Sequence, residues 1–164
     1  MSMNRYQPHV FVLPEDDANR QLANGFDLGL SPWKFRVLDE AGGWLKVLEL
    51  FVSDHIAEMD RFRNRFMILL IDFDGREERL QLAKARIPER LTERVFVLGA
   101  LKEPQDLKKA WLGDYEEIGL AMAQDCREGA NTTWGHPLLR HNASELDRLR
   151  VHVRPILFPS IPSS

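Results

Sequence analysis

The sequence predicts a single three-layer α/β domain, with a mainly parallel four-stranded sheet and additional helices towards its C-terminal end. Three observations predict this class. Four short apolar runs, at 9–13, 33–39, 66–71 and 94–99, have the length and composition of strands. Amphipathic helical patterns separate them, which is the element order of a parallel sheet with right-handed crossovers. The chain has 164 residues, 44% of them hydrophobic, which is enough apolar material for the core of one domain.

The first half of the chain alternates strand and helix. The run "HVFVL" (9–13) is β-branched and apolar, and Pro14 bounds it. Residues 16–26 follow with apolar side chains at helical spacing, and Gly25 is interpreted as their stop signal. The segment 33–39 alternates as a second strand does, and 44–63 carries one apolar stripe at steps of three and four, which predicts the longest helix.

The second half repeats this alternation and adds helices. The run "FMILLI" (66–71) is continuously apolar, as expected of a strand covered by helices on both faces. A helix is predicted over 75–86, before Pro88, and "RVFVLG" (94–99) is the fourth strand. Three further helices are expected from an early proline and two capping-box patterns, which are Pro104, Asp114 with Glu117, and Asn142 with Glu145.

The two ends of the chain differ from this pattern. Residues 1–8 are polar and are predicted to be a loose N-terminal segment, and 9–157 form the domain. The tail 158–164, "FPSIPSS", combines prolines and serines, which predicts disorder.

Composition limits the function classes. A formal net charge of −3 and a pI near 6.0 exclude a broadly basic nucleic-acid binder, although 22 Lys and Arg permit a local basic groove. The single Cys126 excludes an internal disulfide, and no apolar run has signal-core or membrane length. We therefore expect a cytoplasmic protein with no membrane partner. Nucleic acid, a protein partner or a second copy of the chain remain open as partners.

Acidic residues follow two of the predicted strands. Asp72 and Asp74 follow the third strand, and Glu15 follows the first, with Asp16 and Asp17 directly after it. Ligands of open parallel sheets bind outside the carboxyl ends of the strands, so these groups converge if the first and third strands are neighbours. Residues two apart on an extended chain point the same way, so Asp72 and Asp74 can share one Mg²⁺ or Mn²⁺. The alternative is helix capping by Asp74 and by Asp16 or Asp17.

The motifs "HVFVLPE" and "MILLIDFD" resemble those of the Toprim superfamily, a fold of topoisomerases, primases and related nucleases. The resemblance covers the element order of roughly 9–112. It implies Mg²⁺ held by Asp72 and Asp74, with Glu15 as a further ligand or as general acid or base, in making or breaking a phosphodiester bond. Many members have glycine directly after the glutamate, whereas this chain has Asp16, and Asp17 competes with Glu15 for its role. In outline the chain is similar to small, stand-alone bacterial Toprim-like proteins linked to defence or nucleic-acid processing.

Other groups and other functions remain open. Asp16, Asp17 and Glu103 could help to hold a second ion, and Arg20, Arg76 and Lys102 could contact phosphate. The run "LLIDFDG" also resembles the opening motif of haloacid-dehalogenase phosphatases, although two predicted strands precede it. A third alternative is a non-catalytic binding or regulatory module on the Toprim scaffold.

Overall fold

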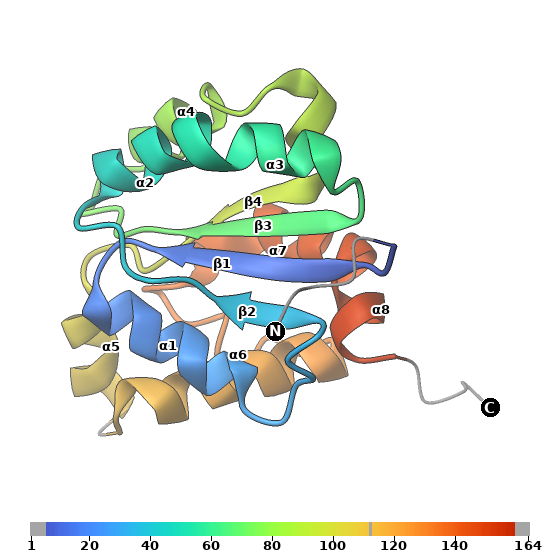
Figure 1. Ribbon diagram of the computed structural model, residues 1–164. Helices are drawn as coiled ribbons and strands as arrows, with labels where there is room; N and C mark the ends of the chain where they lie inside the picture. The colour runs from blue at the N-terminus through green and yellow to red at the C-terminus, as the bar shows by residue number, and fades with distance from the viewer. Residues whose placement is uncertain (1–5, 112, 160–164) are drawn as a thin grey trace.

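The protein is built on one parallel sheet, which the computed structural model shows with the helices above and below it (Figure 1). The model describes residues 6–111 and 113–159. The sheet order is β2-β1-β3-β4, and every pair of neighbouring strands is parallel. The strands are β1 (His9–Pro14), β2 (Phe35–Val37), β3 (Arg65–Leu70) and β4 (Val95–Leu98). The predicted three-layer α/β class is confirmed.

One face of the sheet is covered by the chain between β2 and β4, seen above the sheet in Figure 1. Its elements are α2 (Trp44–Leu50), the π-helical turn η1 (Phe51–His55), α3 (Ile56–Arg61), α4 (Glu78–Lys84) and the 3-10 helix η2 (Glu89–Arg94). Phe51, Met59 and Ala83 pack there against Met67, which points to this face from β3. The burial of these apolar side chains is what holds the layer to the sheet.

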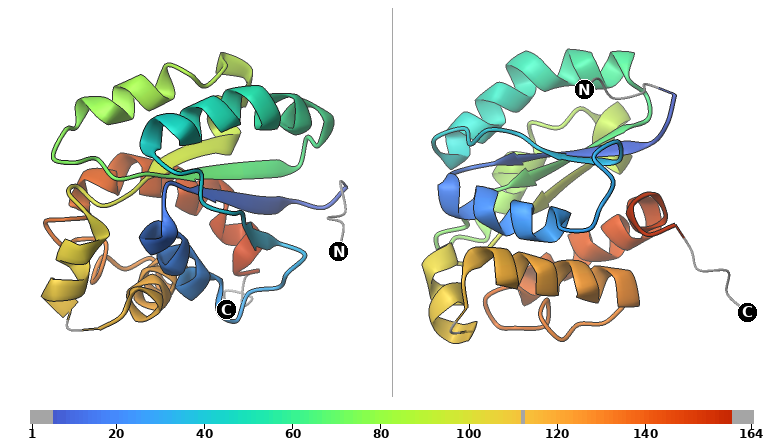
Figure 2. Two further views of the ribbon diagram at one scale, coloured as in Figure 1. Left: turned by 60° about the vertical axis from the view of Figure 1, so that its left-hand side comes forward. Right: turned by 60° about the horizontal axis from the view of Figure 1, so that its bottom comes forward.

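The opposite face is covered by the first helix and by the helices after β4 (Figure 2). These are α1 (Asp17–Asp27), α5 (Pro104–Trp111), α6 (Tyr115–Glu128), α7 (Ala143–His152) and α8 (Arg154–Leu157), with the 3-10 turn η3 (Arg140–Asn142) before α7. Leu22, Met122 and Leu149 pack there against Val12 and Ile68. Since adjacent strand residues point to opposite faces, the continuous apolar runs of β1 and β3 supply both cores.

The helices α1 and α6 approach each other through two glycines. A Cβ at Gly25 would lie 2.0 Å from the backbone oxygen of Glu116, and one at Gly119 would lie 2.0 Å from that of Leu22. The helix α1 continues past Gly25 to Asp27, so the interpretation of Gly25 as a stop signal is wrong. Glycine stands there because no side chain fits between the two backbones.

The predicted helix 44–63 is confirmed in extent, but it is not uniform. The backbone N–H of Ile56 donates to the carbonyl of Phe51, five residues earlier, so one wider turn separates α2 from α3. Phe51, which begins this turn, and Met59, in α3, are both fully buried. The wider turn keeps these side chains on the face that packs against the sheet.

Side chains from the C-terminal part of the chain bind backbone groups along the outer edge of β4 and at its end. Asn142 donates from Nδ2 to the carbonyl of Gly99 (2.9 Å) and accepts from the Gly99 N–H at Oδ1 (3.1 Å). Its amide thus pairs with the strand end as another strand would. Arg148 donates to the carbonyls of Thr92 and Val95 and lies over the Phe96 ring, and it pairs with the buried Glu145.

Two of the predicted capping boxes have different outcomes. Asp114 accepts from the N–H of Glu117 (2.8 Å) at the start of α6, as predicted. Asn142 makes no such bond to α7, because its amide is bonded to Gly99 and to the carbonyl of Leu139. That capping prediction is therefore wrong, and Glu145 is paired with Arg148 and Lys84 instead.

The structure describes only part of the two predicted end segments, 1–8 and 158–164. Tyr6 and Gln7 are exposed, whereas residues 1–5 of the predicted N-terminal segment lie outside the described residues. Phe158, assigned from sequence to the tail, packs on the core beside Phe26, and 160–164 also lie outside the described residues. Among the described residues, no helix has the length and apolarity needed to cross a membrane.

Candidate metal centre

The order of the strands places a topological switch point between β1 and β3. The chain moves from β1 to β2 on one side, and then crosses to β3 on the other side of β1. At such a switch point the connections leave the sheet in opposite directions, and ligands of open α/β sheets bind there, outside the carboxyl ends of the strands. Glu15 follows β1 and Asp72 lies two residues beyond the end of β3, so both belong to this switch point.

Three carboxylates come together at the switch point. Glu15, Asp16 and Asp72 each offer an oxygen, and these oxygens all lie within 4.8 Å of one another. The pairing of β1 with β3 sets this arrangement, because the N–H of Glu15 donates to the carbonyl of Leu70 (2.9 Å). The N–H of Asp72 in turn donates to Oε2 of Glu15 (3.2 Å). The predicted convergence of acidic residues from two strands is thus present, with Asp16 as its third member.

Burial makes this cluster unusual in its protonation. Glu15 is 7% exposed and Asp72 is 9% exposed. Burial, followed by the hydrogen bond and the negative charge of Asp72, raises the pKa of Glu15 to about 8 from 4.5. Burial also raises the pKa of Asp72, although its hydrogen bonds with Glu15 and Asn19 oppose the change. Without a cation the carboxylates therefore keep a proton between them at neutral pH.

Asn19, in the first turn of α1, bridges two of these carboxylates. Its Nδ2 donates to Oδ1 of Asp16 and to Oδ1 of Asp72, at 2.9 Å each. Its backbone N–H also donates to Oδ1 of Asp16 (2.9 Å), which makes Asp16 the N-cap of α1. Asn19 is fully buried, and its Oδ1 has no hydrogen-bond partner among the described residues. Sequence reasoning missed Asn19, although its spacing of three from Asp16 places both on the first helical turn.

Asp74 does not join the cluster. Its backbone has φ of 51°, so the extended alternation that would align it with Asp72 ends at this residue. Its side chain is 62% exposed and forms an ion pair with Arg79 (3.6 Å). It also does not cap the next helix, because α4 begins at Glu78 with Glu77 at its N-cap.

Arg79 is a second residue that sequence reasoning missed. Its Nη1 donates to the carbonyl of Asp72 (2.8 Å), and its guanidinium lies over the ring of Trp44, 4.5 Å from the centroid. Trp44 starts α2 directly after Gly42 and Gly43, whose N–H groups both donate to the carbonyl of Glu15. The backbones of the two acidic segments are therefore each held by neighbouring groups.

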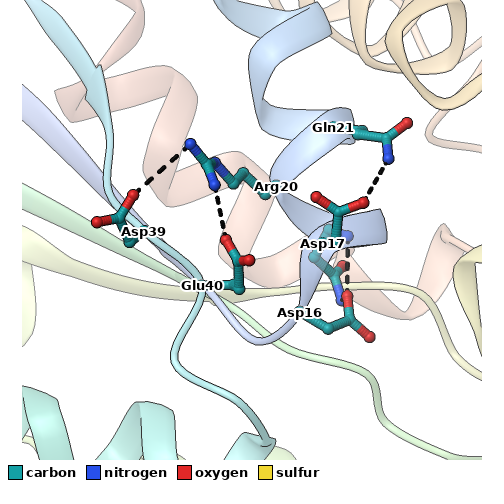
Figure 3. Close-up of polar contacts among 7 residues, drawn as sticks. Asp16, Asp17, Arg20, Gln21, Asp39 and Glu40 are labelled. Atoms are coloured by element: carbon teal, nitrogen blue, oxygen red, sulfur yellow. Dashed lines mark hydrogen bonds and ion pairs between the residues drawn. The ribbon is translucent and has the colours of Figure 1, made fainter.

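Asp17 and Arg20, both on α1, are engaged with partners outside the acidic cluster (Figure 3). Asp17 is exposed and accepts from Gln21 (2.7 Å), so Glu15 and not Asp17 is the residue of this segment that meets Asp72. Arg20 forms ion pairs with Glu40 (2.9 Å) and Asp39 (3.6 Å), after β2. These two partners therefore hold the guanidinium of Arg20 at the segment that follows β2.

The other residues singled out in the sequence lie on exposed loops at the carboxyl end of the sheet. Arg76 and Lys102 are exposed, after β3 and β4 respectively. Glu103 is also exposed, and its negative charge contributes to the raised pKa of Asp72. The same charge, with those of Asp16 and Asp72, adds to the effect of burial in raising the pKa of Tyr115 at the start of α6.

The residues present fit a small divalent cation. Carboxylate oxygens are the hard ligands that Mg²⁺ and Mn²⁺ prefer, and three of them lie close enough together to face one ion. A cation would also offset the burial and the negative charge of Asp72 that raise the pKa of Glu15. The buried and unpaired oxygen of Asn19 is a further donor beside them.

Compared with protein-family models, with curated proteins and with solved structures, the chain gives no match. The Toprim resemblance therefore rests on the element order and on the acidic residues themselves.

Proposed function

We propose that the protein is a Toprim-like, Mg²⁺- or Mn²⁺-dependent enzyme that hydrolyses phosphodiester bonds of nucleic acid in the cytoplasm. The observation that carries this proposal is the meeting of Glu15, Asp16 and Asp72 within 4.8 Å at the switch point of the sheet. An acidic cluster at this position suits an ion that is shared with phosphate oxygens.

The proposed roles follow from where each side chain lies. Asp16 and Asp72 hold the ion, because helix capping and the extended chain after β3 fix their positions. The ion supplies positive charge against the charge that builds on the phosphate. Glu15 is the proposed proton carrier, because it is the carboxylate of the cluster whose pKa burial and Asp72 raise to about 8 in the ion-free protein.

Asp74 and the cations have a lesser place in this proposal. Asp74 stays at the rim in its ion pair with Arg79 and is not a ligand. Arg76 and Lys102 are the exposed cations that we propose for contact with the substrate backbone. Arg20 contributes only if phosphate displaces Glu40 and Asp39.

The test is a matched pair of substitutions, Asp72→Asn and Asp74→Asn. Each removes one negative charge with almost no change of shape, two residues apart. Calorimetric titration with Mn²⁺ and cleavage assays on single- and double-stranded DNA and RNA are run on both variants and on the wild type. We expect Asp72→Asn to lose binding and cleavage, and Asp74→Asn to keep both.

The other outcomes identify the competing functions. Equal ion binding and equal cleavage by Asp72→Asn and the wild type would refute the proposal. Ion binding by the wild type without cleavage of any of the four substrates indicates a non-catalytic binding or regulatory module. Turnover of p-nitrophenyl phosphate that Asp72→Asn abolishes, with no diester cleavage, indicates a phosphatase.

A further inference from the structure

We propose that Asn19 is a ligand of the same divalent ion, and that it contributes its side-chain oxygen after the amide has turned over. This inference rests on the proposed function, because it concerns the ion held by Asp16 and Asp72. It adds a neutral oxygen donor from α1, at a position that the acidic motifs do not mark.

The first observation is the place of the Asn19 amide. Its Nδ2 lies 2.9 Å from Oδ1 of Asp16 and 2.9 Å from Oδ1 of Asp72, so it stands where these two carboxylates converge. Its N–H bonds partly offset their repulsion, as a cation would. A cation shared by the two oxygens has to take over these contacts, because amide hydrogens and a cation repel each other.

The second observation is the unpaired oxygen. Asn19 is fully buried, and no donor among the described residues reaches its Oδ1. A buried polar atom without a partner is costly, and native structures contain few of them. The amide therefore pairs only its nitrogen in this orientation, which gives its oxygen no partner.

A half-turn of the amide connects the two observations. The oxygen and the nitrogen of an Asn side chain have nearly the same size and exchange positions on rotation. After that turn, Oδ1 faces Asp16 and Asp72 from the place that Nδ2 now holds. The backbone N–H of Asn19 stays bonded to Oδ1 of Asp16, so the helix start need not move.

The resulting ligand set consists only of hard oxygens. Together with Asp16 and Asp72, the Asn19 oxygen completes a set from one helix start and one loop, beside Glu15. Carboxylates combined with an amide oxygen and waters are the donors typical of Ca²⁺, Mg²⁺ and Mn²⁺ sites.

The first experiment measures Mn²⁺ affinity by calorimetry for the wild type and for Asn19→Ala. If Asn19 is a ligand, we expect Asn19→Ala to bind Mn²⁺ roughly ten-fold more weakly or worse. If the amide only competes with the ion, Asn19→Ala binds equally or more tightly, which overturns the inference. The control is Asn24→Ala, the same substitution at an exposed position of α1, which leaves the affinity unchanged.

The second experiment uses the wild type alone, so it does not depend on a variant that folds. The side-chain amide resonances of ¹⁵N-labelled wild type are followed during a Mg²⁺ titration. We expect the Asn19 signals to move as their hydrogen bonds to carboxylates are lost, while those of Asn24 stay in place. Unchanged Asn19 signals at saturating Mg²⁺ overturn the inference.

The two proposals fail in different ways. A wild type that binds neither ion overturns the proposed function and this inference together. A wild type that binds Mn²⁺, beside an Asn19→Ala variant of equal affinity, overturns the role of Asn19 alone.

Discussion

Glu15 couples the charge of the acidic cluster to the stability of the protein. Its pKa is raised to about 8 by burial and by Asp72, from an ordinary value of 4.5. Between these values the unfolded chain releases a proton that the folded protein keeps. The free energy of unfolding of the ion-free protein therefore falls as the pH rises through this window.

We expect Glu15→Gln to remove much of this fall. Thermal unfolding with a chelator present, from about pH 5 to about pH 8, measures it. The wild type should lose stability across the range, and Glu15→Gln should be the more stable of the two at the upper end. Glu93→Gln, at an exposed position of η2, should follow the wild type. A wild type that becomes more stable with rising pH contradicts the expectation.

At the residue scale, the sequence predicts which segments meet but not which atoms do. Glu15 and Asp72 come together because both follow parallel neighbouring strands, and this follows from motif and topology alone. The positive φ of Asp74 is a local backbone conformation. The glycine after it is the only feature of "DFDG" that indicates a turn there. Asn19 contacts Asp72 because of the way α1 packs against the sheet. The spacing of apolar residues in the sequence does not predict this contact.

At the scale of elements, the glycine contact between α1 and α6 decides where α1 lies. In an exposed helix interior, Gly→Ala normally stabilises by roughly 0.5–1 kcal/mol. Here a Cβ at Gly25 or Gly119 would meet backbone at 2.0 Å, so the helices would have to separate. We expect Gly25→Ala and Gly119→Ala each to lower the free energy of unfolding by about 2 kcal/mol.

Urea denaturation measures both variants. Asn24→Ala, beside Gly25 on the exposed side of α1, is the control and should change the stability little. Because α1 carries Asp16 and Asn19, the two glycine variants should also bind Mn²⁺ more weakly if the acidic cluster holds the ion. Gly→Ala variants as stable as the wild type would show that α6 does not fix the position of α1.

The elements themselves were largely predictable from periodicity and breakers. The four strands and most helices lie where apolar runs, prolines and glycines placed them. The π-helical turn at Phe51–His55 was not predictable, because the stripe fits an uninterrupted helix equally well. Asn142 and Glu145 match a capping box in spacing, but long-range partners at β4 and α4 take up both side chains.

At the scale of the whole molecule, Asn142 joins the C-terminal helices to the sheet. It is 2% exposed and bonds both backbone groups of Gly99, which lies 43 residues earlier in the chain. Asn142→Ala leaves a buried N–H and a buried C=O unpaired. We expect it to lower the free energy of unfolding by about 3 kcal/mol.

Chemical denaturation followed by tryptophan fluorescence tests this expectation. The matched control is Asn131→Ala, at an exposed position where the side-chain oxygen accepts a hydrogen bond from Arg150 (3.3 Å). Its effect should stay within about 0.5 kcal/mol. An Asn142→Ala variant as stable as this control would show that the amide does not matter for holding α7 at β4.

The side-chain contacts at the outer edge of β4 also affect whether a second copy of this protein can add a strand to the sheet. An exposed edge strand offers a row of unpaired backbone N–H and C=O groups, with which an extended segment of another molecule can pair. On one border Asn142 occupies both backbone groups of Gly99 and Arg148 reaches the carbonyl of Val95, and β2, on the opposite border, has only three residues. Growth of the sheet from molecule to molecule, the route to fibres, therefore meets competing side chains on one border and a very short strand on the other.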